Sequence, residues 1–401
     1  MNKRLVQINV TCNGSTGRIM EQIQRKAEDE GWEAYSFFGR GKPSNGKCYK
    51  IGNKIGIIWD VFLTRVFDKH GHGNKRVTRK LIKKIEEIDP DVIQLHNIHG
   101  YYINIQILFK YLKKCNKKIV WTLHDCWAFT GHCAYFTFPK CDKWKKGCSG
   151  KCLRKKDYPQ CLLKNNAESE YNLKKELFSG INNLTIITPS NWLAQLVKES
   201  YLNQYDIKVI NNGIDLNIFK PTKTIDIRKK YNIPEDKKMI LGVASVWDRR
   251  KGLEEFIKLS QIIDVYKYII VLVGLTSKQI KGLPNNIIGI QRTENIEELA
   301  NFYTESYVFV NPTLEDNFPT TNLEALACGT QVVTYKTGGS GECITDEIGQ
   351  VVNPRDYKEL NSTINELRED KFKRKKCVLE AQKCNATKKY LEYIKIYKGE
   401  K

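Results

Sequence analysis

The most informative part of the chain is residues 311–342, with the sequence NPTLEDNFPTTNLEALACGTQVVTYKTGGSGE. The β-branched and aromatic run from Tyr307 to Val310 leads into it and predicts a strand. A helix is expected to begin at Thr320–Asn322 and to end at Cys328-Gly329, and a second strand is expected over Gln331 to Tyr335. The two strands therefore place their following loops side by side at the carboxyl edge of a parallel sheet, where open α/β sheets bind ligands.

The loops in this region offer both donors and acceptors of hydrogen bonds. Free backbone N–H groups at helix N-termini, and in the glycine-rich run Thr337 to Glu342, suit anions such as phosphate. The carboxylates of Asp316 and Glu324 can accept hydrogen bonds from hydroxyl groups. Phosphate donors beside hydroxyl acceptors favour a nucleotide sugar as the ligand.

The spacing of these residues resembles the signature of the retaining GT-B glycosyltransferases of family 4. That signature is an acid, seven residues, Glu-Ala and then Ala-x-Gly, and here it runs from Asp316 through Glu324 to Gly329. The family's Gly-Gly-x-x-Glu loop is matched at residues 338–342. One departure is that Asp316 stands where the family usually has Glu, and Glu315 precedes it. The resemblance covers nearly the whole chain.

The resemblance implies a role for each matching residue. Glu324 is expected to bind the ribose hydroxyls and Asp316 the donor sugar, although Glu324 alone could be an ordinary first-turn acid. His124, in a Thr-x-His-Asp strand end, is expected to contact the donor sugar or to polarise the acceptor side. His99 is the weaker candidate on the acceptor side, because a scattered histidine is more often structural. The expected catalytic residues are His124, Asp316 and Glu324, and the expected donor-binding residues are Gly14, Gly17, Arg250, Lys251, Glu315, Asn317, Phe318, Gly339 and Glu342.

The loop after the strand Met239 to Ala244 is the expected diphosphate contact. Lys251 lies there and can pair with a diphosphate as a point charge; the alternative is a solvated basic turn. The family usually has Arg five residues earlier, where this chain has Val246, so Arg249 or Arg250 is the expected substitute.

The order of predicted elements indicates two domains. Strands and helices alternate in both halves, which predicts an α/β protein with two doubly wound, Rossmann-like sheets; the GT-B resemblance implies that they face each other across a cleft. We expect an acceptor-side domain over residues 1–212 with a cysteine-rich insertion at 126–161, a nucleotide-sugar domain over 213–380, and a helix over 381–401 that packs back on the first domain.

Composition narrows the class of protein further. The chain has 401 residues, 41% of them hydrophobic, without an apolar run of bilayer length. Its N-terminus enters a strand pattern without a signal peptide, so the cytoplasm is the expected location. Residues 1–212 carry 36 Lys and Arg against 19 Asp and Glu, a net charge of +17, whereas the remainder carries +4. This asymmetry favours an anionic partner for the first half, and a general lysine bias is the alternative.

One segment of the first half could provide a membrane surface. Residues 54–84 predict two helices, with a break near 69–73, that combine apolar residues with many lysines and arginines. Such a pattern can lie on an anionic membrane surface, which would make the protein peripheral at the inner face of the cell membrane. A core-packed helix pair with a solvated basic face explains the pattern equally well.

The cysteines are concentrated in one segment. Six of the 13 lie between Cys126 and Cys161, which in a cytoplasmic protein favours metal over disulfides. A structural zinc site is expected from Cys133, Cys141, Cys148 and Cys152, with Cys126 and Cys161 as alternates. Reduced thiols in an acceptor-side insertion are the alternative.

The expected function is retaining transfer of a sugar, hexosyl or hexosaminyl, from a UDP- or GDP-sugar to a hydroxyl acceptor. The acceptor is expected to be a glycan on a polyprenyl diphosphate, in surface polysaccharide biosynthesis. No cofactor is expected for catalysis, and no nucleic-acid-binding motif is evident. A sugar-nucleotide epimerase of the same architecture and a non-catalytic, zinc-stabilised binding protein are the alternatives.

Overall fold

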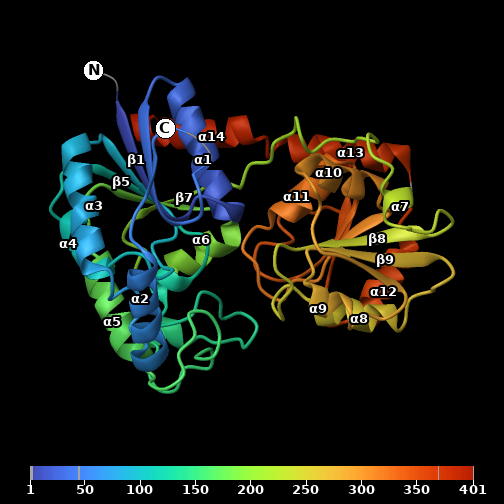
Figure 1. The fold of residues 1–401 in the computed structure, drawn as a ribbon, viewed down its shortest axis with the longest axis horizontal. Coiled ribbons are helices and arrows are strands. Elements are labelled where there is room, and N and C mark those ends of the chain that lie inside the picture. The colour runs from blue at the N-terminus through green and yellow to red at the C-terminus, as the bar shows by residue number, and fades with distance from the viewer. Residues whose placement is uncertain (1–2, 44–45, 369, 401) are drawn as a thin grey trace. The chain divides into compact units, whose positions relative to one another are not determined.

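The computed structural model describes residues 3–43, 46–368 and 370–400 and divides the chain into two compact units (Figure 1). Unit 1 comprises Met1–Asn211 together with Lys389–Lys401, and unit 2 comprises Asn212–Lys388. Each unit is an α/β body built on one parallel sheet. The chain returns to unit 1 at Lys389, later than residue 381, where the last segment was expected to begin.

Unit 1 is built on a sheet of seven parallel strands in the order β3-β2-β1-β4-β5-β6-β7. Its apolar core centres on β-branched residues of β1, β4 and β5, because strands covered on both faces are hydrophobic along their length. The elements are β1 (Arg4–Thr11), α1 (Gly14–Asp29), β2 (Glu33–Arg40), β3 (Cys48–Lys50), α2 (Lys54–Phe67), α3 (Lys75–Ile88), β4 (Val92–Leu95), α4 (Ile105–Leu112), β5 (Lys118–Thr122), the 3-10 turns η1 (Trp127–Phe129) and η2 (Lys143–Lys146), α5 (Ala167–Phe178), β6 (Leu184–Thr188), α6 (Asn191–Lys198) and β7 (Asp206–Val209).

Unit 2 is built on a sheet of six parallel strands in the order β10-β9-β8-β11-β12-β13. The order reverses between β8 and β11, which is the topological switch point where such sheets bind ligands. The elements are α7 (Ile227–Lys230), β8 (Lys238–Val243), α8 (Leu253–Ser260), β9 (Tyr268–Val273), α9 (Ser277–Ile280), β10 (Ile287–Ile290), α10 (Ile296–Glu305), β11 (Val308–Asn311), α11 (Thr320–Ala327), β12 (Val332–Tyr335), β13 (Gly349–Val352), α12 (Tyr357–Glu366) and α13 (Lys371–Gln382).

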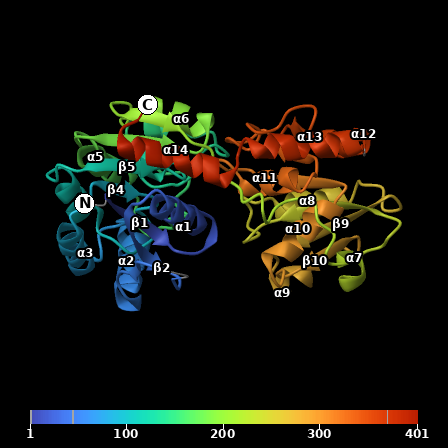
Figure 2. The same ribbon diagram turned by 90° about the horizontal axis from the view of Figure 1, so that it is seen from above.

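The C-terminal helix α14 (Ala386–Lys398) packs on unit 1, as Figure 2 shows from above. The Tyr397 hydroxyl donates to Gln94 Oε1 at 3.1 Å, and Lys118 Nζ donates to Ile396 O at 2.5 Å. Tyr397 also meets Trp32 edge to face, with ring centroids 5.8 Å apart. These contacts join the last helix to β4 and β5, which lie more than 250 positions earlier in the chain.

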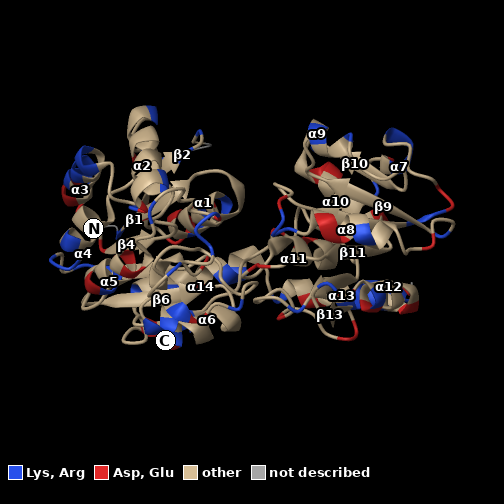
Figure 3. Cartoon of the chain, turned by 90° about the horizontal axis from the view of Figure 1, so that it is seen from below, with Lys and Arg blue, Asp and Glu red and all other residues tan. Residues whose placement is uncertain are grey.

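Two surface features concern helices near the N-terminus. Helix α2 exposes apolar side chains, with Ile55 77% and Trp59 55% exposed. Helix α3 instead presents lysines and arginines, and Figure 3 shows it blue where α2 is mostly tan. No helix in the described part of the chain has both the length and the apolar character needed to cross a bilayer.

Candidate functional site

The three loops of unit 2 that follow β8, β11 and β12 are joined by hydrogen bonds. The backbone N–H of Leu314 donates to Arg250 O at 2.8 Å, which joins the loop after β11 to the loop after β8. The Thr337 hydroxyl donates to Thr313 O at 2.7 Å, which joins the loop after β12 to the loop after β11. Gly338 has φ +54°, and a Cβ there would lie 1.7 Å from Asp316 O. Glycine at this position therefore allows two loops to approach closely.

The loops bring Lys251 and Asp316 into direct contact. Lys251 Nζ lies 2.5 Å from Asp316 Oδ2, and Arg250 donates to Glu315 O at 2.8 Å. Burial alone would raise the pKa of Asp316, but the charges of Lys251 and Arg250 outweigh it, so this pKa lies below its usual value. Asp316 is therefore ionised at neutral pH beside two cations.

Glu324 lies in the first turns of α11 and is only 4% exposed. Its Oε2 accepts a hydrogen bond from the Tyr303 hydroxyl at 2.8 Å. A carboxylate this deeply buried is normally held by hydrogen bonds, and the partner comes from α10. Tyr303 was not a candidate in the sequence, because nothing in its spacing connects it with Glu324.

A further network holds the beginning of α11 against the loop after β12. Asn311 Nδ2 donates to Asn322 Oδ1 at 2.8 Å, and Asn322 Nδ2 donates to Ser340 O at 2.9 Å. The Ser340 and Thr334 hydroxyls lie 2.6 Å apart. All four side chains are buried, so they fix both loops without depending on solvent.

The other expected donor-binding residues of unit 2 are distributed over the same loops. Glu315, Asn317 and Gly339 are buried, whereas Glu342 is exposed. Phe318 packs in the apolar core of unit 2. Its ring therefore helps to hold the loop after β11 in place.

The glycine loop of unit 1 is shorter than the expected loop over residues 13–17, because α1 already begins at Gly14. Gly14 has φ +73°, a backbone conformation that glycine adopts without strain. A Cβ on Gly17 would lie 2.4 Å from the carbonyl carbon of Cys12, so only glycine lets α1 pack this closely on the end of β1. Gly14 thus lies in the exposed first turn of α1, whereas Gly17 is buried and holds the helix close to β1.

Histidines gather where β4 and β5 of unit 1 end. His96 Nδ1 lies 3.2 Å from His124 Nε2, and burial lowers the pKa of His124 to about 4. His124 is therefore neutral at pH 7. His99 Nε2 contacts Asp125 Oδ2 at 2.9 Å. His96 and Asp125 were not candidates in the sequence, although each stands at a strand end that also carries a candidate histidine.

The four cysteines of the expected zinc site line one small cavity of unit 1. Across residues 3–43, 46–368 and 370–400, however, no three His, Cys, Asp or Glu side chains are placed to hold a metal ion. The structure thus gathers Cys133, Cys141, Cys148 and Cys152 without closing a four-thiolate site. Cys161 lies apart from this arrangement, with its thiol donating to Lys164 O at 3.1 Å.

The two parallel-sheet, Rossmann-like bodies define an α/β protein of the GT-B fold class. The model "Glycosyltransferase Family 4" matches residues 17–218, half of the chain, and "Glycosyl transferases group 1" matches residues 223–384. The chain belongs to glycosyltransferase family 4 and is a glycosyltransferase.

Named relatives agree with this assignment. The "Putative colanic acid biosynthesis glycosyl transferase WcaC" of Escherichia coli is 23% identical over 380 residues, which cover 89% of each chain. Sucrose-phosphate synthase from Thermosynechococcus elongatus has the same fold, with a TM-score of 0.74 at 18% identity and 99% of each chain covered. Anabaena HepE, solved in complex with UDP-glucose, has a TM-score of 0.66 at 14% identity, with 99% of each chain covered.

Proposed function

We propose that this enzyme transfers a glycosyl group from a nucleoside-diphosphate sugar to a hydroxyl acceptor with retention of anomeric configuration. The contact between Lys251 and Asp316, at the meeting of three strand-end loops, carries the proposal. A cation of the kind that suits a diphosphate thus lies next to a carboxylate of the kind that accepts hydrogen bonds from sugar hydroxyls. The presence of UDP and UDP-glucose in solved structures of HepE supports testing uridine nucleotides first.

In this proposal the donor lies along the unit 2 loops. Lys251 and Arg250 bind the diphosphate, Glu324 accepts hydrogen bonds from the ribose, and Asp316 accepts them from the donor sugar. The anomeric carbon loses its bond to the diphosphate oxygen, which keeps the electron pair, and gains a bond to the acceptor oxygen. The acceptor's hydroxyl proton is released and balances the charge left on the diphosphate. Lys251 stabilises that developing charge, an effect that is strongest in a site from which water is excluded.

The unit 1 candidates have complementary roles in the proposal. Gly14 and Gly17 open the N-terminus of α1 to a phosphate. His124, neutral because burial lowers its pKa to about 4, acts as a hydrogen-bond partner for a sugar hydroxyl and not as a cation. His99, oriented by Asp125, is the acceptor-side candidate.

We further propose a lipid-linked glycan acceptor at an anionic membrane, as suits a relative named for colanic acid biosynthesis. Two surfaces of unit 1 support this. Ile55, Ile58, Trp59 and Phe62 form an exposed apolar surface on α2. Six exposed basic residues lie on α3: Lys75, Arg76, Arg79, Lys80, Lys83 and Lys84. Each cation near an anionic surface contributes about 1 kcal/mol, so a few suffice for reversible binding.

Thermal stabilisation by a panel of UDP-, GDP- and TDP-sugars tests the donor assignment, because a ligand of the native state raises Tm. We expect one base to stabilise the protein, and product analysis with an acceptor to show sugar transfer with retention. Formation of an epimer in place of a glycoside would contradict a transferase. Absence of stabilisation by every donor would contradict the donor site.

Sedimentation with vesicles tests the membrane proposal separately. We expect binding to anionic vesicles at low salt, weaker binding to neutral ones, and release at high salt except for the part due to apolar insertion. Replacing Arg76, Arg79, Lys83 and Lys84 with Gln should reduce the binding that depends on salt. The double variant Trp59→Ser with Phe62→Ser should reduce the binding that persists at high salt. Donor binding should stay unchanged in both variants. Equal binding to both vesicle types, or none, would favour a soluble acceptor.

A further inference from the structure

The cysteine cavity of unit 1 lies in a long segment with little regular structure. Between β5 and α5, residues 123–166 contain only the short turns η1 and η2 in the described part of the chain. The cavity has a volume of about 20 Å³ and is lined by His132 together with Cys133, Cys141, Cys148 and Cys152. This volume is about that of one water-sized sphere, so the cavity has room for a single ion.

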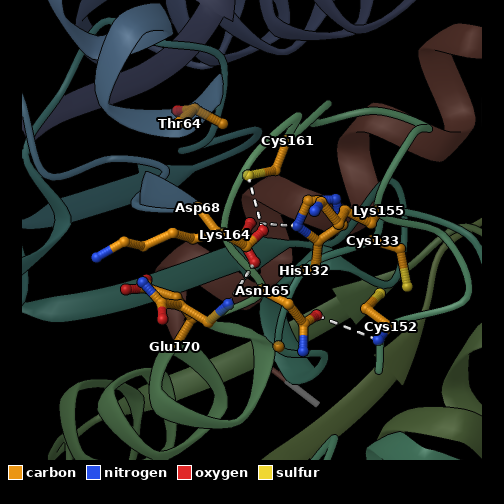
Figure 4. Close-up of polar contacts among 12 residues, drawn as sticks. Thr64, Asp68, His132, Cys133, Cys152, Lys155, Cys161, Lys164, Asn165 and Glu170 are labelled. Carbon is orange, nitrogen blue, oxygen red and sulfur yellow. Dashed lines mark hydrogen bonds and ion pairs between the residues drawn. The ribbon is translucent and has the colours of Figure 1, made fainter. Parts of the chain in front are cut away.

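His132 has a ring nitrogen at this cavity that can act as a metal ligand. It is 3% exposed, and its Nδ1 lies 2.5 Å from Asp68 Oδ1, while Nε2 has no hydrogen-bond partner among the described residues. Figure 4 shows the ring with Asp68 on one side and the sulfurs of Cys133 and Cys152 on the other. A buried ring nitrogen without a partner destabilises the folded protein unless something binds it. A histidine whose other nitrogen meets a carboxylate is the usual arrangement of a metal ligand, because the carboxylate fixes the tautomer and the ring.

A backbone donor and a buried cation lie beside the thiols around His132. The backbone N–H of Gly131 donates to Cys148 Sγ at 3.1 Å, and the backbone of Arg154 donates to Cys152. Lys174 is buried nearby, with its Nζ 2.8 Å from Trp127 O and within reach of the charges of Cys133 and Cys148. A divalent ion with three thiolates and one neutral imidazole carries a net charge of −1, which the Lys174 ammonium would balance.

We propose that this cavity binds a zinc ion through His132 Nε2 and three of the four thiolates of Cys133, Cys141, Cys148 and Cys152. The thiol side chains must rotate toward His132, because the described side chains do not yet converge on one point. Binding releases three thiol protons, and four protein ligands leave no open position, so the ion is structural. It connects the irregular segment 123–166 to α2 through Asp68, the residue that follows that helix.

Metal analysis of the full chain, purified without chelator, tests this proposal. We expect about one zinc per chain. His132→Ala and Cys148→Ser should lose most of it, and Asp68→Asn should weaken binding roughly ten- to hundredfold. Cys161→Ser is the matched control, because Cys161 is a buried cysteine of the same segment whose thiol already donates to backbone oxygens. It should keep its zinc and its Tm.

X-ray absorption at the zinc edge of the unsubstituted protein keeps the test valid if a variant fails to fold. One nitrogen and three sulfur neighbours are expected. Four sulfurs without nitrogen would overturn the role of His132. Folded protein with free thiols and no metal, or with disulfides among these cysteines by mass spectrometry, would overturn the metal site altogether.

Discussion

The loops that follow the carboxyl ends of the strands are stabilised differently in the two units. In unit 2 the loops after β11 and β12 span residues 312–319 and 336–348, and buried hydrogen bonds such as those of Asn322 hold them. In unit 1 the strand β5 is followed by residues 123–166, a segment of more than 40 residues. Aromatic side chains and a buried contact between His132 and Asp68 pack this segment, which also contains the cysteine cavity. The ends of a short loop are already positioned by the strands that it joins. A long segment needs cross-links of its own, because ordering it costs more conformational entropy and it forms few backbone hydrogen bonds that offset this cost.

Gly338→Ala is the sharpest test that close loop approach builds the unit 2 site. The new Cβ would lie 1.7 Å from Asp316 O in a residue with φ +54°, so the loop must move. A displacement of about 1 Å can cost roughly 10²-fold in activity, and donor affinity measured by calorimetry should fall by a similar factor.

Gly180→Ala in unit 1 is the control, since φ there is +68° with no atom within 4 Å of the added Cβ. It should cost only about 1–2 kcal/mol of stability and leave donor binding intact. Equal donor binding in both variants would show that the loops tolerate separation.

Lys251→Ala should weaken binding of a nucleoside diphosphate roughly tenfold to hundredfold, because a charged hydrogen bond contributes about 1.5–3 kcal/mol. Nucleoside binding should hardly change, since the ammonium acts on phosphate alone. Asp316 loses its partner in this variant, so stability should also fall, and Lys251→Ala with Asp316→Asn should recover part of it. Loss of nucleoside and diphosphate binding to the same degree would indicate a folding defect.

Glu324→Ala should lower donor affinity about tenfold or more by removing the acceptor for the ribose hydroxyls. Tyr303→Phe provides the comparison, because it removes only the hydroxyl that orients Glu324 and should lower affinity severalfold at most. Titration of each folded variant with the donor checks both. Unchanged affinity in Glu324→Ala would reject its assignment to the ribose.

A further expected effect is a difference in acid sensitivity between the two units. All six histidines are in unit 1, and burial lowers the pKa of His70, His96 and His124. Unfolded histidines bind protons below about pH 6.5 while these folded ones do not, so unit 1 loses stability as pH falls from about 6.5 to 4. Burial also raises the pKa of Asp60 to about 6, so the folded unit binds a proton there that the unfolded chain does not bind until about pH 4. This one proton partly offsets the loss of stability.

In unit 2 the lowered pKa of Asp316 contributes stability that is lost only as pH falls below about 4. Amide hydrogen exchange between pH 6.5 and 4.5 should therefore show unit 1 weakening first. Each proton that only the unfolded unit binds changes the free energy of unfolding by about 1.4 kcal/mol per pH unit. His124→Gln removes one such proton and should reduce the pH dependence of the free energy of unfolding by that amount. Parallel loss of protection in both units would contradict the assignment.

The elements were largely predictable, because buried parallel strands are continuous apolar runs and helices follow them with recognisable caps. The strands β8, β11 and β12 and the helix pair α2 and α3 lie close to where their patterns placed them. The C-terminal segment is a correction, since the expected helix over 381–401 is the end of α13 followed by α14. Gly14, expected in a loop, begins α1, and end positions of this kind depend on packing, which sequence periodicity does not report.

Residue spacing along one chain determined the class of this protein: the acid-to-Glu324 frame and the glycine loop predicted a sheet edge suited to a phosphate beside hydroxyl groups, and the family match agrees. Tertiary structure alone decided which distant side chains meet. The contacts of Lys251 with Asp316, Tyr303 with Glu324, and His132 with Asp68 join residues 65, 21 and 64 positions apart. Local patterns fix what each segment becomes, but such contacts depend on strand order and burial, which only the folded sheet supplies.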